Sequence, residues 1–168
     1  MAETISIDRR WITSELINGI DHERTLAREA NARAESPPDA SLTVLYHEIA
    51  QADERHTAIL EKIAARYGHT PSESTEGGIG GMIQKLKVQV GEFGSGPHDQ
   101  VWTDLTAKAR WIHWLTAWAH TFQALGDLES GREIAAVLDD ERIHRDALQN
   151  SLNRLVEQRA STEKKVEK

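Results

Sequence analysis

Two carboxylate–histidine pairs are the residues of this chain whose types and spacing best suit chemistry. Asp53 and His56 lie three positions apart, as do Glu141 and His144. Side chains three positions apart on an α-helix project from the same face, so each pair presents an oxygen donor and a nitrogen donor together. Such donors bind divalent metal ions, and they also bind each other. The sequence therefore predicts a His/carboxylate site, stabilised either by metal or by mutual Glu–His pairing.

The apolar stripes around these pairs predict that the pairs face the protein interior. Glu141 and His144 continue the apolar stripe of their segment, and His56 stands where a further apolar residue is expected. Glu23 likewise interrupts a stripe of small residues in an earlier segment. Buried carboxylates and imidazoles are costly unless they are paired or bound to metal. Glu23 therefore joins the two pairs as a candidate metal ligand.

Four long stretches with helical periodicity must position these side chains. No stretch shows the alternation that is typical of a β-strand. Consecutive prolines interrupt the periodicity after the first stretch, and glycines follow the second and the third. The expected helices are residues 5–34, 40–67, 99–125 and 128–158.

The lengths of the connections predict how these helices are arranged. Only a few residues join the first helix to the second and the third to the fourth, so each pair is expected to form an antiparallel hairpin. Residues 68–98 are long enough to cross the length of the bundle. Two hairpins joined by a long crossover make an all-α, ferritin-like four-helix bundle. We expect one domain, residues 1–160, and a solvated C-terminal tail, residues 161–168.

Composition excludes several classes of function. The chain has no cysteine, so thiolate metal sites, iron–sulfur clusters and disulfides are ruled out. Its 27 acidic residues outnumber its 20 basic ones, which argues against a nucleic-acid or anionic membrane partner. No run approaches the ~20 apolar residues of a membrane span, and the N-terminal residues lack an apolar signal core. We expect a cytoplasmic protein.

The arrangement of the candidate ligands resembles a known family. Glu23, then Asp53-x-x-His56, then Glu141-x-x-His144 are similar to three of the four elements of the di-iron carboxylate motif of the ferritin-like superfamily. Residues 124–127, leading to 138–141, are similar to rubrerythrin-like and YciE-type members. The resemblance implies iron, with zinc or manganese as alternatives. It also implies dioxygen or peroxide chemistry: a ferroxidase, a peroxidase or a protein of stress-protective iron handling.

Two positions depart from that motif. Asp53 stands where the family has Glu, and its shorter side chain has less reach. The third helix has no carboxylate between Asp104 and Asp127. His113 is the ligand-capable residue near the expected place, so it becomes the sixth candidate ligand. A dinuclear site, a site for one metal and a site without metal all remain possible on the sequence.

The third helix is apolar around most of its circumference, more than one core requires. Four of the five tryptophans of the chain are on it. Tryptophan is enriched at protein interfaces, so we expect a homodimer that buries this helix. The alternatives are that the crossover segment covers it or that it forms an aromatic ligand pocket. The four residues are Trp102, Trp111, Trp114 and Trp118.

Two other classes of function compete with the metalloprotein, and the sequence does not decide whether the chain is an enzyme. One is a metal-free helical bundle of ferritin-like ancestry that serves in association. The other is a metal-dependent bundle of the DinB type, which would leave Glu23 without a role. Its histidine ligands would be His47, His113 and either His120 or His144. His22 is expected at the surface in each case.

Overall fold

The computed structural model of the chain describes residues 9–69 and 96–166. Within these residues it is all-helical and contains no strand, as the periodicity predicts. The predicted crossover at 68–98 lies mostly outside the described residues. The elements are α1 (Arg9–Glu35), the short 3-10 helix η1 (Ala40–Leu42), α2 (Thr43–Arg66), α4 (Pro97–Ala124) and α5 (Leu128–Val166).

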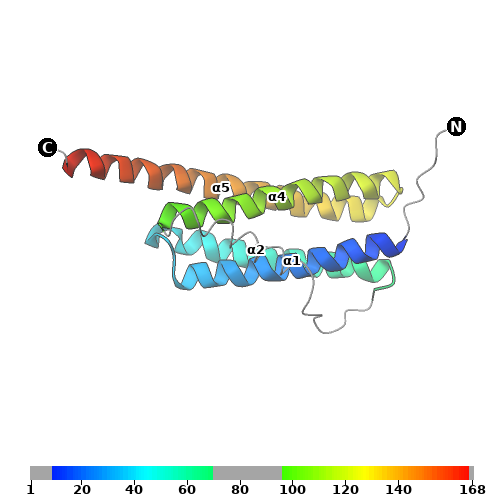
Figure 1. The fold of residues 1–168 in the computed structure, drawn as a ribbon. Coiled ribbons are helices and arrows are strands. Elements are labelled where there is room, and N and C mark those ends of the chain that lie inside the picture. The colour runs from blue at the N-terminus through cyan, green and yellow to red at the C-terminus, as the bar shows by residue number, and fades with distance from the viewer. Residues whose placement is uncertain (1–8, 70–95, 167–168) are drawn as a thin grey trace.

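The four long helices pack as two pairs, α1 with α2 and α4 with α5, and α5 extends beyond the other three (Figure 1). In the first connection, the Asp39 side chain accepts a hydrogen bond of 2.9 Å from the backbone N–H of Ser41. In the second connection, Gly126 has a φ of 75°, which favours glycine. Asp127 then caps α5, because its Oδ1 accepts a hydrogen bond of 3.0 Å from the backbone N–H of Ser130. No helix in the described part of the chain is long and apolar enough to cross a membrane.

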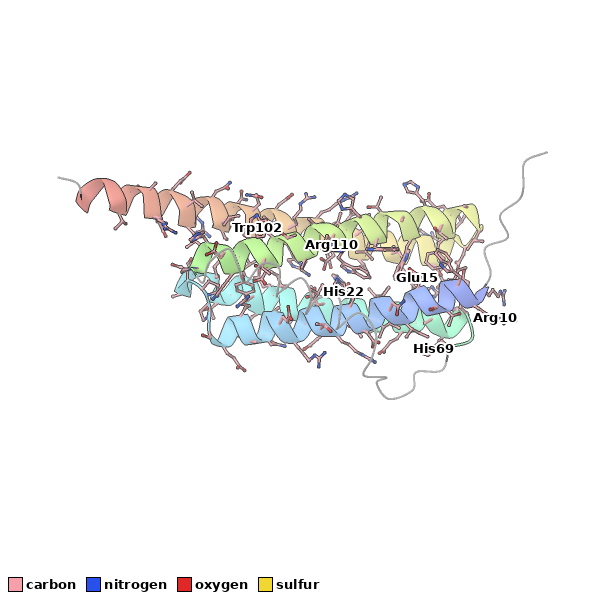
Figure 2. The ribbon with its side chains drawn as sticks, viewed as in Figure 1. Arg10, Glu15, His22, His69, Trp102 and Arg110 are labelled. Carbon is pink, nitrogen blue, oxygen red and sulfur yellow. The ribbon has the colours of Figure 1, made fainter. Side chains whose placement is uncertain are left out.

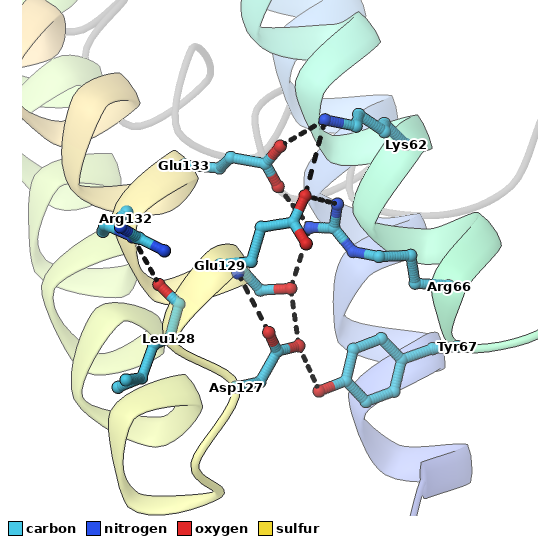
Figure 3. A network of polar contacts seen from close by, with 9 residues as sticks. Lys62, Arg66, Tyr67, Asp127, Leu128, Glu129, Arg132 and Glu133 are labelled. Carbon is cyan, nitrogen blue, oxygen red and sulfur yellow. Dashed lines mark hydrogen bonds and ion pairs between the residues drawn. The ribbon is translucent and has the colours of Figure 1, made fainter.

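Ion pairs join the end of α2 to the start of α5 (Figure 3). Arg66 binds Glu129 at 3.1 Å and also pairs with Glu133, which Lys62 contacts at 2.7 Å. Next to them, Tyr67 donates a hydrogen bond of 2.9 Å to Asp127, the capping residue of α5. The network joins α2 to α5, the two helices that carry the carboxylate–histidine pairs.

The buried apolar residues form two clusters, one toward each end of the bundle. On α2, Ala50 belongs to one cluster and Leu60 to the other; on α5, the corresponding residues are Leu148 and Leu138. The carboxylate–histidine pairs stand between these residues in the sequence of each helix. The two clusters therefore enclose a polar layer and separate it from water at both ends of the core.

Two of the four tryptophans of α4 belong to the core of the chain itself. Trp111 and Trp118 are buried, with ring centroids 5.5 Å apart and nearly perpendicular planes. Both rings lie against Gly19 of α1. Trp102 and Trp114 are about half exposed, at 46% and 51%. The apolar excess of α4 thus divides into an inner pair and two outward-facing rings.

The contact between Gly19 and the tryptophans predicts opposite effects for two glycine-to-alanine changes. A Cβ at Gly19 would lie 2.5 Å from Cη2 of Trp118, whereas a Cβ at Gly131 would have neighbours at 3.5 Å or more. We expect Gly19→Ala to lower the free energy of unfolding by about 1–3 kcal/mol, because rigid rings must move. Gly131→Ala should raise it by about 0.5–1 kcal/mol, since alanine suits a helix better than glycine. Urea denaturation measures both; an equal effect of the two variants would contradict the close contact.

Candidate metal centre

Four buried side chains from three helices converge in the polar layer. Glu23 comes from α1, Asp53 and His56 from α2, and Glu141 from α5. One donor atom from each lies within 4.8 Å of the others, so that together they can hold a metal ion. The three carboxylates are fully buried, and His56 is 1% exposed. They are four of the six ligands that the sequence predicts.

Helix α4 adds two hydrogen-bond donors to this group, and neither was among the predicted site residues. Lys108, 3% exposed, donates from Nζ to Asp53 Oδ1 at 2.6 Å and to Glu141 Oε1 at 2.7 Å. Trp111 donates from Nε1 to Glu23 Oε1 at 2.7 Å. The helix that lacks a ligand carboxylate therefore holds the carboxylates of the other three helices in place.

Each member of the group has one polar atom without a hydrogen-bond partner. One oxygen of each carboxylate accepts from Lys108 or Trp111, and the second oxygen has no hydrogen-bond partner. Buried polar atoms are rarely left unpaired, so four of them in one place indicate a site for a further partner. The unpaired atoms are Glu23 Oε2, Asp53 Oδ2, His56 Nδ1 and Glu141 Oε2.

His56 lies in the middle of the group. Its Nδ1 is 3.3 Å from Glu141 Oε1 and 3.6 Å from Glu23 Oε1, without hydrogen-bonding geometry to either. Its Nε2 lies 3.3 Å from Oδ2 of the half-exposed Asp140. A carboxylate on Nε2 orients the ring and directs Nδ1 toward the other donors, as the outer partners of metal-binding histidines do.

Burial and mutual charge set the protonation of the group. Burial raises the pKa of Glu23 and raises that of Asp53 well above its usual value. Burial would also raise the pKa of Glu141, but Lys108 and His56 outweigh it and lower this pKa to about 2. Burial alone would lower the pKa of His56; its two glutamate neighbours, Glu141 and Glu23, instead raise it to about 10. Nearby carboxylates likewise outweigh burial and raise the pKa of Lys108.

The charges of the group come close to balancing without a metal ion. Three carboxylates face two cationic side chains, Lys108 and His56, which leaves a net charge of −1 (−3 + 2) when all five are ionised. A proton on Glu23 or Asp53 brings this to zero. A divalent metal ion would displace such protons, because carboxylate and imidazole ligands bind metal in their deprotonated forms.

The structure does not bring His113 into this group. His113 is exposed on α4, and its Nδ1 lies 2.7 Å from the carbonyl oxygen of Ala109. His144 is half-buried beside the group on α5, and its Nδ1 has no hydrogen-bond partner. His47 and His120, proposed for the DinB-type alternative, are exposed.

His22 is buried, and the expectation that it lies at the surface is wrong. Its ring packs against Trp111 with centroids 4.5 Å apart and planes tilted by 55°, between α1 and α4 (Figure 2). Burial lowers the pKa of His22 to about 4, so the ring is neutral. The neutral His22 ring packs against Trp111, and Trp111 in turn donates a hydrogen bond to Glu23. His22 lies three positions after Gly19 and four before Leu26, both of which are buried. This spacing places His22 on the same face of α1 and indicates that it is buried as well.

A signal for Lys108 was also present in the sequence. Val101, Lys108, Leu115 and Phe122 are each seven positions apart, and all four are buried. Seven positions are close to two helical turns, so a lysine in this series is a core residue of α4. A buried lysine needs a carboxylate partner, and the predicted acidic ligands are the available candidates.

A small cavity adjoins the group between α1, α2, α4 and α5. It has a volume of about 30 Å³, enough for a water molecule or a ligand of similar size. Asp53 and Lys108 line it, and so do Glu29, Arg33 and Asp104. The cavity gives small molecules a place next to the carboxylates.

Comparison of the chain with models of protein families, with curated proteins and with solved structures finds no match. The function proposed next therefore rests on the geometry of the buried group.

Proposed function

We propose that this chain is a metalloprotein that binds a divalent metal ion in the middle of its four-helix bundle. The convergence of four ligand atoms, one from each of Glu23, Asp53, His56 and Glu141, carries the proposal. Each of these buried residues also has a polar atom without a hydrogen-bond partner. Pairing of α1 with α2 and of α4 with α5 supports a ferritin-like arrangement of two antiparallel hairpins. His144 is proposed as a further ligand, because its unpaired Nδ1 is three positions after Glu141 on the same helix.

Iron is the metal that we propose for this centre. Three carboxylates and one imidazole form an oxygen-rich donor set, which suits iron and manganese better than metals that prefer sulfur. Zinc accepts the same ligands and is the alternative. Bound iron would supply dioxygen or peroxide chemistry, consistent with a ferroxidase or peroxidase in iron handling or oxidative stress. The residues of this chain would hold the ion, exclude bulk water with the two apolar clusters, and orient the carboxylates through Lys108 and Trp111.

Metal content tests the proposal through two neighbouring residues of α2. Protein produced without a metal-binding tag or chelator should contain iron or another divalent metal by elemental analysis. Asp53→Asn removes the charge of a buried ligand and should reduce that content at least tenfold. The matched control is Glu54→Gln, which should leave the metal content unchanged because Glu54 is exposed. Wild-type protein that stays metal-free after incubation with Fe(II), Mn(II) and Zn(II) would contradict the proposal.

A metal-free association protein is the second candidate, and Lys108 is the observation that favours it. The Lys108 ammonium group already binds two of the carboxylates and supplies part of the charge that a metal would bring. In this case the exposed Trp102 and Trp114 would be the functional residues, at a homodimer contact on α4. A dimer by light scattering together with no metal uptake would favour this candidate over the first.

A further inference from the structure

We propose that the ammonium group of Lys108 takes the place of a second metal ion, so that the centre binds one divalent ion per chain. This inference rests on the metal-binding function proposed above. The di-iron resemblance implies a centre with two metal ions. We infer instead a centre with one metal ion, in which the ammonium group of Lys108 is the second cation.

The division of the carboxylate oxygens carries the inference. Lys108 Nζ lies 2.6 Å from Asp53 Oδ1 and 2.7 Å from Glu141 Oε1, which places one cation between an oxygen of each. Asp53 Oδ2 and Glu141 Oε2, the opposite oxygens, are the unpaired ones. In a two-metal centre, carboxylates bridge cations that are about 3.5–4 Å apart, one oxygen to each. Here one oxygen of each carboxylate is already bound to the Lys108 ammonium group, and the other oxygen has no hydrogen-bond partner.

The ligand count points the same way. Glu23, Asp53, His56 and Glu141 each offer one ligand atom within 4.8 Å of the others, and four ligand atoms suffice for a single ion. The α4 carboxylate beside the adjoining cavity, Asp104, accepts hydrogen bonds from Tyr46 at 2.7 Å and Arg33 at 3.1 Å. The two contributions of α4 to the group itself, Lys108 and Trp111, are hydrogen-bond donors. A second ion would lack ligands from this helix and would have to displace Lys108.

Charge supports one divalent ion as well. With Lys108 cationic and His56 neutral as a ligand, three ionised carboxylates leave a net charge of −2 (−3 + 1) around the unpaired atoms. One divalent ion neutralises this charge. Two such ions would leave the buried group with a charge of +2, which is costly away from water.

Lysine at position 108 should therefore determine the metal stoichiometry. Wild-type protein, stripped with chelator and titrated with Mn(II), should bind one ion per chain and give the six-line paramagnetic resonance spectrum of an isolated ion. Lys108→Ala removes the ammonium group and frees both oxygens. We expect this variant to bind a second ion per chain, and the two close ions to broaden the spectrum by coupling. Arg110→Ala, a change at an exposed position of the same helix, should stay at one ion.

Circular dichroism tests whether Lys108→Ala is folded. Lys108→Glu, produced with metal in the medium, is measured beside it. Lys108→Glu should likewise bind two ions, since it supplies a fourth carboxylate. Two ions per wild-type chain, or one ion per chain in every Lys108 variant that folds, would overturn the inference while leaving the proposed function intact. A wild-type chain that binds no ion would overturn both, and uptake by Lys108→Ala alone would show that the lysine excludes metal altogether.

Discussion

Replacing Lys108 by methionine should lower the free energy of unfolding of the metal-free protein by about 3–5 kcal/mol. The change keeps an unbranched side chain one atom shorter, but removes both hydrogen bonds and the positive charge between Asp53 and Glu141. Two carboxylates would then stay buried without their cation, and removal of one member of a buried ion pair is strongly destabilising for this reason. Urea denaturation in the presence of chelator measures the loss.

A second lysine provides the control for this measurement. Lys62 binds Glu133 at the similar distance of 2.7 Å, but its side chain is 62% exposed. Exposed ion pairs contribute ~0–1 kcal/mol, so Lys62→Met should cost much less than Lys108→Met. Added divalent metal should restore part of the stability of Lys108→Met, because the ion supplies the missing charge. Equal losses in the two lysine variants would show that the buried carboxylates do not depend on Lys108.

Periodicity was sufficient to predict the helices and four of the site residues. Glu23, His56 and Glu141 interrupt apolar stripes, and an interrupted stripe indicates a buried polar group whatever the packing around it. Asp53 followed from its spacing to His56. These predictions depend only on which residues share a face of one helix, and the sequence contains that information.

Side chains that meet between helices were harder to predict. A lysine is usually solvated, so its type does not predict burial, although Lys108 stands in a buried seven-residue series. The sequence predicts a ligand from the third helix near positions 111–113, where His113 is the ligand-capable residue. His113 faces solvent, while Trp111 and Lys108 face the group. The rotation of α4 about its axis determines this choice, and ligand types alone do not specify that rotation.

Alanine variants of three histidines should show, by their affinity for metal, which histidines are ligands and which are only neighbours of the centre. His56 lies between the carboxylates and has an unpaired Nδ1, so His56→Ala should weaken metal binding on the order of 100-fold or more. His113→Ala should leave the affinity unchanged, because the ring is exposed and its Nδ1 lies close to the backbone of its own helix. His144→Ala tests the remaining predicted ligand: a loss comparable to that of His56→Ala would add His144 to the centre.

Thermal unfolding with and without metal provides the second measurement on these variants. Metal at about 100 times its Kd stabilises a protein by about 2.7 kcal/mol if it binds only the folded state. For a chain of this size, that corresponds to a rise in Tm of about 5–11 °C. Wild-type protein and His113→Ala should show this rise, and His56→Ala should not. If His56 serves only to pair with Glu23 and Glu141, His56→Ala will instead lower Tm by the same amount with chelator as with metal. That result would identify a self-paired polar core in place of a metal centre.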